Sequence, residues 1–202
     1  MANLLIYYAH PGAHKSHVNK VMARMARTID GISIVDLYQE YPRFDIDVDR
    51  EQARLLEHDV ILFQSPLFWY STPSIIKEWI DLVLEHGFAY GSHGDKLSGK
   101  TMMMALSAAG PEEAYSSGGY QHFPLRTFLT PFEQTARLCN MRFAAPYVLY
   151  SSLRAPGQNL VEPHVAGYCA LIEAIRDDRF DFEATTEMDV LQAETLPMSK
   201  GE

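Results

Sequence analysis

Long apolar stretches are missing from this chain of 202 residues. Its longest apolar runs, such as Val60–Phe63, fall far short of the roughly 20 residues that a membrane-spanning helix needs. The N-terminus leads directly into another such run, Leu4–Tyr8, without the basic flank and small-residue cleavage site of a signal peptide. We therefore expect no signal peptide and a cytoplasmic location.

Cysteine is scarce as well. Cys139 and Cys169 lie in segments with helical apolar spacing, and neither has a close Cys or His partner at the spacing of a zinc site. We expect both to be small buried hydrophobic residues in a reducing compartment, and we expect no metal.

Positive charge is in short supply: 17 Lys and Arg face 26 Asp and Glu, a formal net charge of −9. This balance disfavours nucleic acid as a partner. The last 26 residues are strongly acidic, so we expect a domain over residues 1–176 and a solvated acidic tail over 177–202. An alternative stays open, because apolar side chains could hold part of this tail against the body or a second subunit. They are Phe180, Phe182, Met188, Val190 and Leu191.

Two glycine-rich signatures are absent, the Walker A motif and the three-glycine dinucleotide fingerprint, so neither a P-loop NTPase nor a Rossmann dehydrogenase is indicated. What is present is an alternation of strand-like and helix-like segments, which predicts an α/β protein with a doubly wound parallel sheet. We expect five strands at residues 4–8, 32–37, 60–64, 101–107 and 143–150. We expect helices at residues 18–29 (capped by Ser16), 51–56, 73–84 (opened by Pro73), 128–138 and 161–175.

Ligands of such sheets bind at the carboxyl ends of the strands, which directs attention to the loops after the first, third and fourth strands. The first loop, His10–Asn19, brings a hydroxyl, an amide and backbone N–H groups to a helix N-terminus, a suitable place for a phosphate. Ser16 could equally be an ordinary helix cap. The three histidines of this loop have no local Asp, Glu or Cys, so they do not predict a metal site.

The loop after the third strand, Gln64–Pro73, crowds aromatic residues between stiffening prolines. A rigid aromatic surface suits a flat conjugated ligand, although these side chains could simply cover the core. The loop after the fourth strand, Ser107–Tyr115, has small residues that allow close approach of a ligand to the backbone. Tyr115 and, farther on, His122 could donate protons there, or each could be an ordinary loop residue.

A series of short motifs extends over residues 4–150, each weak alone and specific in combination. They are His10-Pro11 with Ser16-His17-x-Asn19, Asp36-Leu37-Tyr38, Tyr41-Pro42-x-Phe44-x-Ile46-Asp47, Gln64-x-Pro66-Leu67-x-Trp69-Tyr70, Lys77-Glu78-Trp79-Ile80-Asp81, Gly87-Phe88-Ala89-Tyr90-Gly91 and Pro131-Phe132-x-Gln134-Thr135-Ala136. In this order the set resembles the NAD(P)H:quinone oxidoreductases of the DT-diaphorase type. The likeness is greatest to a bacterial branch that includes ancillary subunits of glutathione-gated potassium-efflux systems.

The resemblance implies a flavodoxin-like fold, a homodimer with flavin at the subunit boundary, and NADH or NADPH as co-substrate. Family members use FMN or FAD, and the short bacterial branch favours FMN. By this likeness the flavin phosphate and ribityl chain would lie against His10, Ser16, His17, Val18 and Asn19. The ring would lie along Pro66, Leu67, Phe68, Trp69 and Tyr70, with its pyrimidine edge at Ser107, Ala108, Ala109 and Gly110. Tyr115 would hydrogen-bond the ring and stabilise charge on the reduced flavin.

The chain departs from the family at two places. Ser107-Ala108-Ala109-Gly110 replaces the usual Thr-Thr-Gly-Gly, which removes one hydroxyl contact to the ring. Gln121 aligns with a histidine proposed as proton donor, so that role is unassigned or moves to His122. The expected function is two-electron ping-pong hydride transfer from NAD(P)H to a quinone or similar small acceptor. The alternatives are a flavodoxin-like electron carrier and a regulatory subunit of a potassium-efflux transporter, which would bring the protein to the inner membrane.

Overall fold

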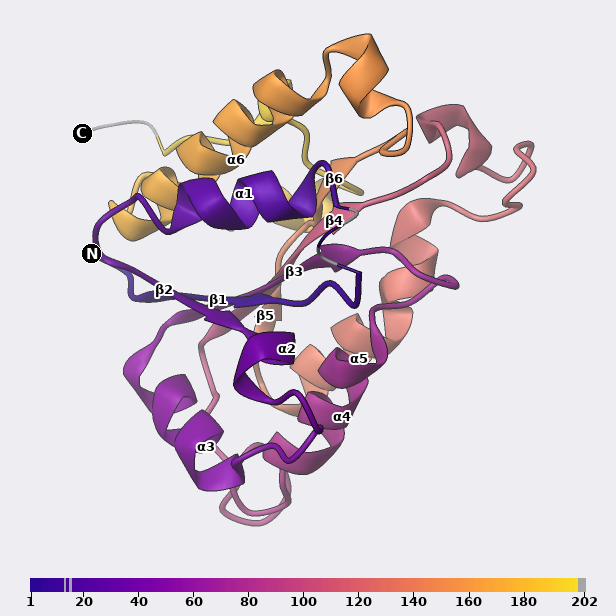
Figure 1. Ribbon diagram of the computed structural model, residues 1–202. Coiled ribbons are helices and arrows are strands. Elements are labelled where there is room, and N and C mark those ends of the chain that lie inside the picture. The colour runs from indigo at the N-terminus through magenta and orange to yellow at the C-terminus, as the bar shows by residue number, and fades with distance from the viewer. Residues whose placement is uncertain (13, 15, 200–202) are drawn as a thin grey trace.

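The computed structural model describes residues 1–12, 14 and 16–199. A parallel sheet forms its centre, with the strand order β2-β1-β3-β4-β5 (Figure 1). Its strands are β1 (Leu4–Tyr8), β2 (Ile32–Asp36), β3 (Val60–Pro66), β4 (Thr101–Ser107), β5 (Arg142–Phe143) and β6 (Tyr147–Leu149). The expected doubly wound parallel sheet is confirmed, and its order reverses between β1 and β3, where ligands of such sheets bind.

The predicted fifth strand is divided in two. β5 and β6 both pair with β4, but Ala144, Ala145 and Pro146 separate them. Proline has no backbone N–H to give to a sheet, so the strand cannot continue unbroken through Pro146.

Helices cover both faces of the sheet (Figure 1). One face carries α1 (Asn19–Ala26) and α6 (Val161–Arg176); the other carries α2 (Leu37–Glu40), α3 (Val48–Glu57), α4 (Ser74–Val83) and α5 (Thr130–Leu138). Successive residues of β3 serve different cores: Leu62 packs with Tyr168 of α6, and Phe63 packs with Trp79 of α4. This alternation is the two-residue period of a strand buried on both faces.

Helix starts differ in detail from the predictions. Val18 rather than Ser16 occupies the cap position of α1, but the Ser16 hydroxyl still accepts a hydrogen bond from the Lys20 N–H at 3.2 Å. Pro73 lies at the cap of α4 rather than inside its first turn. The short helix α2 was not expected; the Asp36 carboxylate starts it by accepting from two backbone N–H groups of its first turn.

A fully buried carboxylate joins α3 to the sheet and to α4. Glu51 accepts hydrogen bonds from the Tyr41 hydroxyl at 2.6 Å and the Trp79 indole at 2.9 Å, and it also bonds Tyr7 and Arg54. A buried charge is tolerated only when donors surround it in this way.

Residues 177–199 are not a solvated tail, so that prediction is wrong for the part of the segment that the structure describes. Phe180 and Leu191 are buried, and Leu191 pairs in parallel with Tyr147 at the side of β6. The Leu191 N–H donates to the Pro146 carbonyl at 2.8 Å, and the Val148 N–H donates to the Leu191 carbonyl at 2.9 Å. Phe182, Met188 and Val190 are half-buried against the two cores, so the apolar residues hold this segment on the body, as the alternative prediction has it.

Within the described residues, no helix combines the length and the apolar character needed to span a bilayer.

Candidate active site

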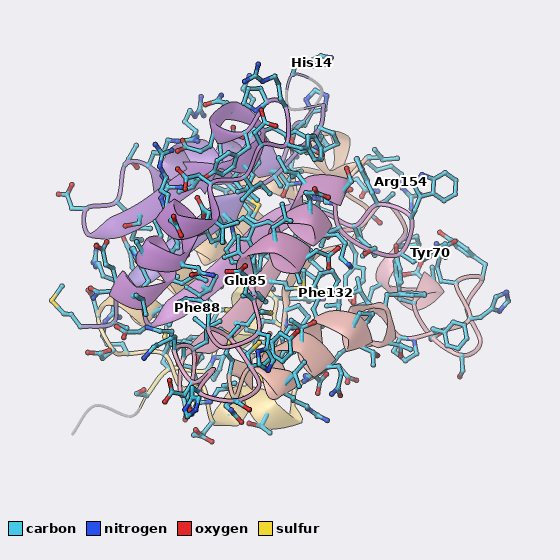
Figure 2. The ribbon with its side chains drawn as sticks, turned by 90° about the horizontal axis from the view of Figure 1, so that it is seen from below. His14, Tyr70, Glu85, Phe88, Phe132 and Arg154 are labelled. Atoms are coloured by element: carbon cyan, nitrogen blue, oxygen red, sulfur yellow. The ribbon has the colours of Figure 1, made fainter. Side chains whose placement is uncertain are left out.

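Loops from four strands meet at the carboxyl edge of the sheet and enclose a cavity of about 310 Å³. Tyr70, from the loop after β3, and Arg154, from the turn after β6, lie on this same side of the molecule (Figure 2). The residues that line the cavity are His10, Gly12, Ser16, His17, Val18, Asn19, Pro66, Phe68, Ser107, Ser152 and Leu153. All five residues expected at a flavin phosphate and ribityl chain are therefore brought together.

A buried hydrogen-bond network fixes the start of α1 against the sheet. The Asn19 amide donates to the Ser107 hydroxyl at 2.6 Å, and the Gln64 amide donates to the Asn19 carbonyl at 2.7 Å. Tyr168 of α6 in turn donates to the Gln64 side chain at 3.1 Å. The Asn19 side-chain oxygen is buried without a partner among the described residues, so an acceptor at the cavity wall is available to a ligand hydroxyl.

His10 presents a donor to the same cavity. Its Nδ1 accepts the Gly12 N–H at 3.1 Å, which requires the ring proton to sit on Nε2. Burial lowers the pKa of His10, so the neutral ring is the prevailing form at pH 7. The edge of the ring meets Phe68, with the ring centroids 5.9 Å apart.

The aromatic loop after β3 makes a tight hairpin turn. Phe68 and Ser71 exchange two backbone hydrogen bonds of 2.9 and 3.0 Å. The residues between them, Trp69 and Tyr70, have φ angles of +50° and +64°. A two-residue turn with both central φ angles positive normally uses Asn and Gly, so two bulky aromatics here are a strained arrangement. Their N–H groups donate to no other described residue.

A second cavity of about 160 Å³ lies on the other side of this turn. It is lined by Leu67, Trp69, Tyr70, Ala109, Gly110, Tyr115 and Gln121. Gly110 lies close to two tyrosine side chains, because a Cβ there would come within 3.0 Å of the Tyr120 hydroxyl oxygen and 3.2 Å of Tyr115 Cε2. The two cavities have no lining residue in common. Both are lined by residues of the Pro66–Tyr70 loop and of the segment Ser107–Gly110, and we refer to them together as the slot.

An aromatic cluster holds Tyr115 in the second cavity. Its ring lies 5.6 Å from that of Tyr150 and 6.3 Å from that of Phe128, which also lies 5.0 Å from Tyr70. Burial raises the pKa of Tyr115, so its hydroxyl stays protonated near neutral pH and remains a hydrogen-bond donor.

Two of the predicted residues do not line this slot. Ala108 is fully buried, and its N–H is used in a 2.8 Å bond to the Leu149 carbonyl, so it joins β4 to β6 instead of facing a ligand. His122 is exposed and lines neither cavity, whereas its neighbour Gln121 lines the second one. A catalytic acid at His122 therefore has no support from the geometry of this chain.

The structure also adds residues that sequence reasoning missed. Ser152 and Leu153 follow β6, and the loop that carries them is hydrogen-bonded to the β4 loop through the Ser151 and Ser152 N–H groups. The signal was available, since this loop too begins at a carboxyl end of the sheet. Phe128 gave no such signal, because its contacts with Tyr70 and Tyr115 depend on the path of the long loop before α5. The described residues contain no group of three His, Cys, Asp or Glu side chains arranged to hold a metal.

The sequence model of the family described as having a flavodoxin-like fold matches residues 2–170. The chain belongs to the flavodoxin-like family. It is 41% identical over 165 residues to the glutathione-regulated potassium-efflux system ancillary protein KefG of Serratia proteamaculans, covering 82% of this chain and 90% of that relative. The resemblance expected from the motifs, to quinone reductases and to the potassium-efflux branch, is confirmed.

Solved structures extend this comparison. The flavodoxin-like chain superposes on general stress protein 14 of Treponema denticola in complex with FMN, with a TM-score of 0.80, 34% identity, and coverage of 86% of this chain and 99% of that one. An NADPH-quinone reductase from P. pentosaceus gives a TM-score of 0.69 with 26% identity, covering 82% of this chain and 95% of the other.

Proposed function

We propose that this protein is a flavin-dependent NAD(P)H:quinone oxidoreductase that uses FMN and acts as a homodimer in the cytoplasm. The observation that carries the proposal is the slot at the carboxyl edge of the sheet. One end of the slot is a helix N-terminus with polar donors. The other end is an aromatic cleft at Trp69 and Tyr70, whose N–H groups donate to no other described residue. A planar ring with a phosphate-tailed side chain matches both ends.

The residues present fit FMN in three respects. The phosphate would meet His10 Nε2–H, the Ser16 hydroxyl and the N-terminus of α1. A ribityl hydroxyl would satisfy Asn19 Oδ1, which is buried and has no partner among the described residues. The polar edge of the ring would accept from the N–H groups of Trp69 and Tyr70, which have no acceptor among the described residues. The FMN complex of the Treponema denticola protein supports the choice of cofactor.

When bound, the flavin supplies the hydride chemistry, accepting from NAD(P)H and donating to the acceptor. The protein binds, orients and donates hydrogen bonds. The Tyr115 hydroxyl, kept protonated by burial, would donate to a ring oxygen and stabilise the negative charge that arises on reduction. Gln121 would orient an acceptor through its amide but cannot supply a proton, so the proton reaching the acceptor must come from another source.

A homodimer would complete the slot. Trp69 is 93% exposed, and Tyr120, Phe123 and Leu153 are also exposed at this edge. A set of large apolar side chains around a ligand slot is typical of an interaction surface. A second copy over this edge would bury them and exclude water from the reaction.

The test is a visible spectrum of the purified protein, taken directly and after incubation with FMN and with FAD. We expect flavin bands, bleaching by NADH or NADPH, and recovery of the bands when 1,4-benzoquinone is added. Tyr115→Phe should slow bleaching without releasing the flavin. A protein that stays colourless with both flavins would disprove the proposal; unchanged reduction kinetics in Tyr115→Phe would remove Tyr115 alone from the mechanism.

The identity to KefG supports a second function on the same protein, that of an ancillary subunit of a potassium-efflux transporter at the inner membrane. The expected result is co-purification with the transporter encoded in the same organism. Tyr115→Phe should keep this association, because the tyrosine lies inside the slot rather than on a docking surface.

A further inference from the structure

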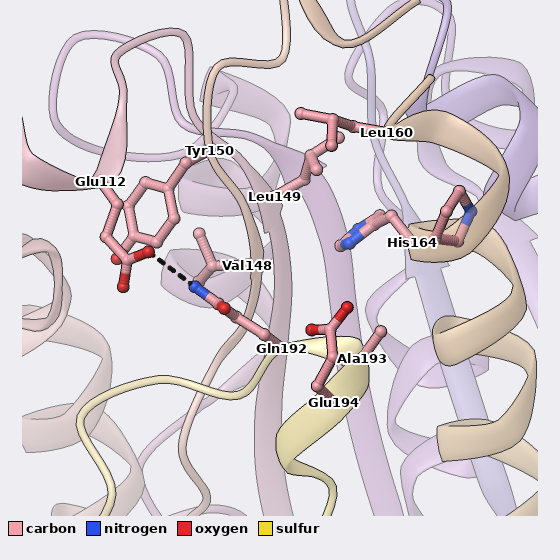
Figure 3. A pocket seen from close by; sticks show the side chains of 10 residues that line it. Glu112, Val148, Leu149, Tyr150, Leu160, His164, Gln192, Ala193 and Glu194 are labelled. Carbon is pink, nitrogen blue, oxygen red and sulfur yellow. Dashed lines mark hydrogen bonds between the residues drawn. The ribbon is translucent and has the colours of Figure 1, made fainter. Parts of the chain in front are cut away.

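A third cavity, of about 260 Å³, lies between the loop after β4, strand β6, helix α6 and the C-terminal segment (Figure 3). It shares no lining residue with the slot. Its walls are Glu112, Val148, Leu149, Tyr150, Leu160, Pro163, His164, Gln192, Ala193 and Glu194. Gln192–Glu194 come from the C-terminal segment, beyond the residues that match the family. One side of the cavity is therefore built by a part of the chain that the family comparison does not cover.

The C-terminal segment packs closely against α6 beside this cavity. A Cβ at Gly167 of α6 would come within 2.4 Å of the Ala193 Cβ and 2.7 Å of the Tyr147 hydroxyl oxygen, so the approach of Ala193 depends on glycine there. The Gln192 amide donates to the Glu112 carboxylate at 3.1 Å, between two of the residues that line the cavity (Figure 3).

His164 is the unusual residue of this cavity. His164 is only 5% exposed, and its Nε2 has no hydrogen-bond partner among the described residues. The imidazole projects from α6 toward the centre of the cavity, between Leu160 and Glu194 (Figure 3). Its other contact is apolar: the ring stacks on Tyr147 with the centroids 4.4 Å apart. A buried polar atom with no partner calls for an explanation.

The charges around the cavity all have one sign. Glu112 and Glu194 are its two acidic residues, and the ten lining residues include no Lys or Arg. Burial lowers the pKa of His164 to about 4, so the ring is a neutral hydrogen-bond acceptor near pH 7. The remaining walls are mostly apolar. An anionic ligand is disfavoured by this field, and a cation with a short hydrocarbon body is favoured.

We propose that this cavity binds a small organic ammonium ion, held between Glu112 and Glu194, with an N–H donated to His164 and its hydrocarbon part against Val148 and Leu160. The volume is below the roughly 300–1,000 Å³ of sites for drug-sized ligands, so the ligand is small. This site does not depend on the proposed flavin chemistry, because it shares no lining residue with the slot.

The test is an NMR titration of the full-length protein labelled with ¹⁵N-histidine, at pH 7 and constant ionic strength. The probes are n-butylammonium chloride, the neutral 1-butanol and the anionic butyrate. The His164 nitrogen signals are assigned by their loss in His164→Gln. We expect n-butylammonium to move the Nε2 signal in a saturable way, and we expect the other two probes and potassium chloride to leave it unchanged.

Charge variants complete the design. Glu194→Gln and Glu112→Gln should each weaken n-butylammonium binding by about tenfold or more, a loss of about 1.4 kcal/mol. Glu162→Gln is the matched control, since Glu162 is an exposed carboxylate on α6 outside the cavity, and it should bind as the unaltered protein does. The proposal is overturned if no saturable shift occurs, if butyrate, butanol or potassium gives the same shift, or if both cavity variants bind normally.

Discussion

The Asn19 side-chain amide donates a 2.6 Å hydrogen bond to the Ser107 hydroxyl, joining the first turn of α1 to the end of β4 in a buried setting. Ser107→Ala leaves the Asn19 amide without this acceptor. An unsatisfied buried donor costs about 1–3 kcal/mol, so we expect the free energy of unfolding to fall by that amount. Urea denaturation measures it.

The same variant should also bind FMN more weakly, because Asn19 loses the contact that orients it at the slot. Ser98→Ala is the control, since Ser98 is exposed in a turn far from the site. Equal unfolding free energies for Ser107→Ala and Ser98→Ala would show that the Asn19 contact contributes nothing to stability.

Gly110 leaves room for the Tyr115 and Tyr120 side chains beside the second cavity. In Gly110→Ala the new methyl group meets the Tyr120 hydroxyl and the Tyr115 ring, so both must shift. We expect the dissociation constant for FMN, measured by flavin fluorescence, to rise by about tenfold or more. Gly118→Ala is a matched control in the same loop, because a Cβ there meets nothing within 4 Å. Similar affinities for the two variants would contradict the close-approach argument.

The sheet could be predicted well because parallel strands buried on both faces are rich in apolar runs, such as the whole of β1 and Val60–Phe63 of β3. The slot could be predicted because its walls follow those strands directly. The path of the C-terminal segment could not be predicted. Its acidic composition indicates a solvated tail, although a few apolar residues, such as Leu191, are buried and hold it in place. The place of His122 could not be predicted for a different reason. Side-chain direction in a turn depends on local φ and ψ angles rather than on sequence distance.

The strained turn beside the slot makes a prediction about stability. Trp69 has a φ of +50° and is 93% exposed, so its side chain contributes little packing to offset the backbone strain. Trp69→Asn should raise the free energy of unfolding by about 0.5–1 kcal/mol, because Asn tolerates the left-handed region better. It should also weaken FMN binding through loss of the aromatic surface. Leu153→Asn, at an exposed position without positive φ, should not gain stability.

The buried carboxylate of Glu51 makes a third stability prediction. Glu51→Gln removes the charge that Arg54 and three aromatic donors surround. Breaking a buried pair from one side costs about 3–5 kcal/mol, and the partial exposure of Arg54 reduces this, so we expect a loss of about 2–3 kcal/mol. Glu57→Gln is the control, because Glu57 is exposed on the same helix, and it should change the free energy of unfolding by less than about 0.5 kcal/mol.

His164 gives the protein a defined sensitivity to acid. Burial lowers its pKa from the model-peptide value of 6.5 to about 4 in the folded state. Between these values the unfolded chain binds a proton that the folded chain does not, so the free energy of unfolding falls as the pH falls from about 6.5 to 4. The full difference is on the order of 3 kcal/mol.

The measurement is urea denaturation of the native sequence and of His164→Gln at a series of pH values. The unfolding free energy of the native sequence, relative to that of the variant, should decline through this window and level off below pH 4. His93→Gln, which alters an exposed histidine, should keep the pH dependence of the native sequence. A constant difference between the native sequence and His164→Gln from pH 7 to pH 4 would mean that His164 titrates equally in both states, which would contradict the effect of burial on its pKa.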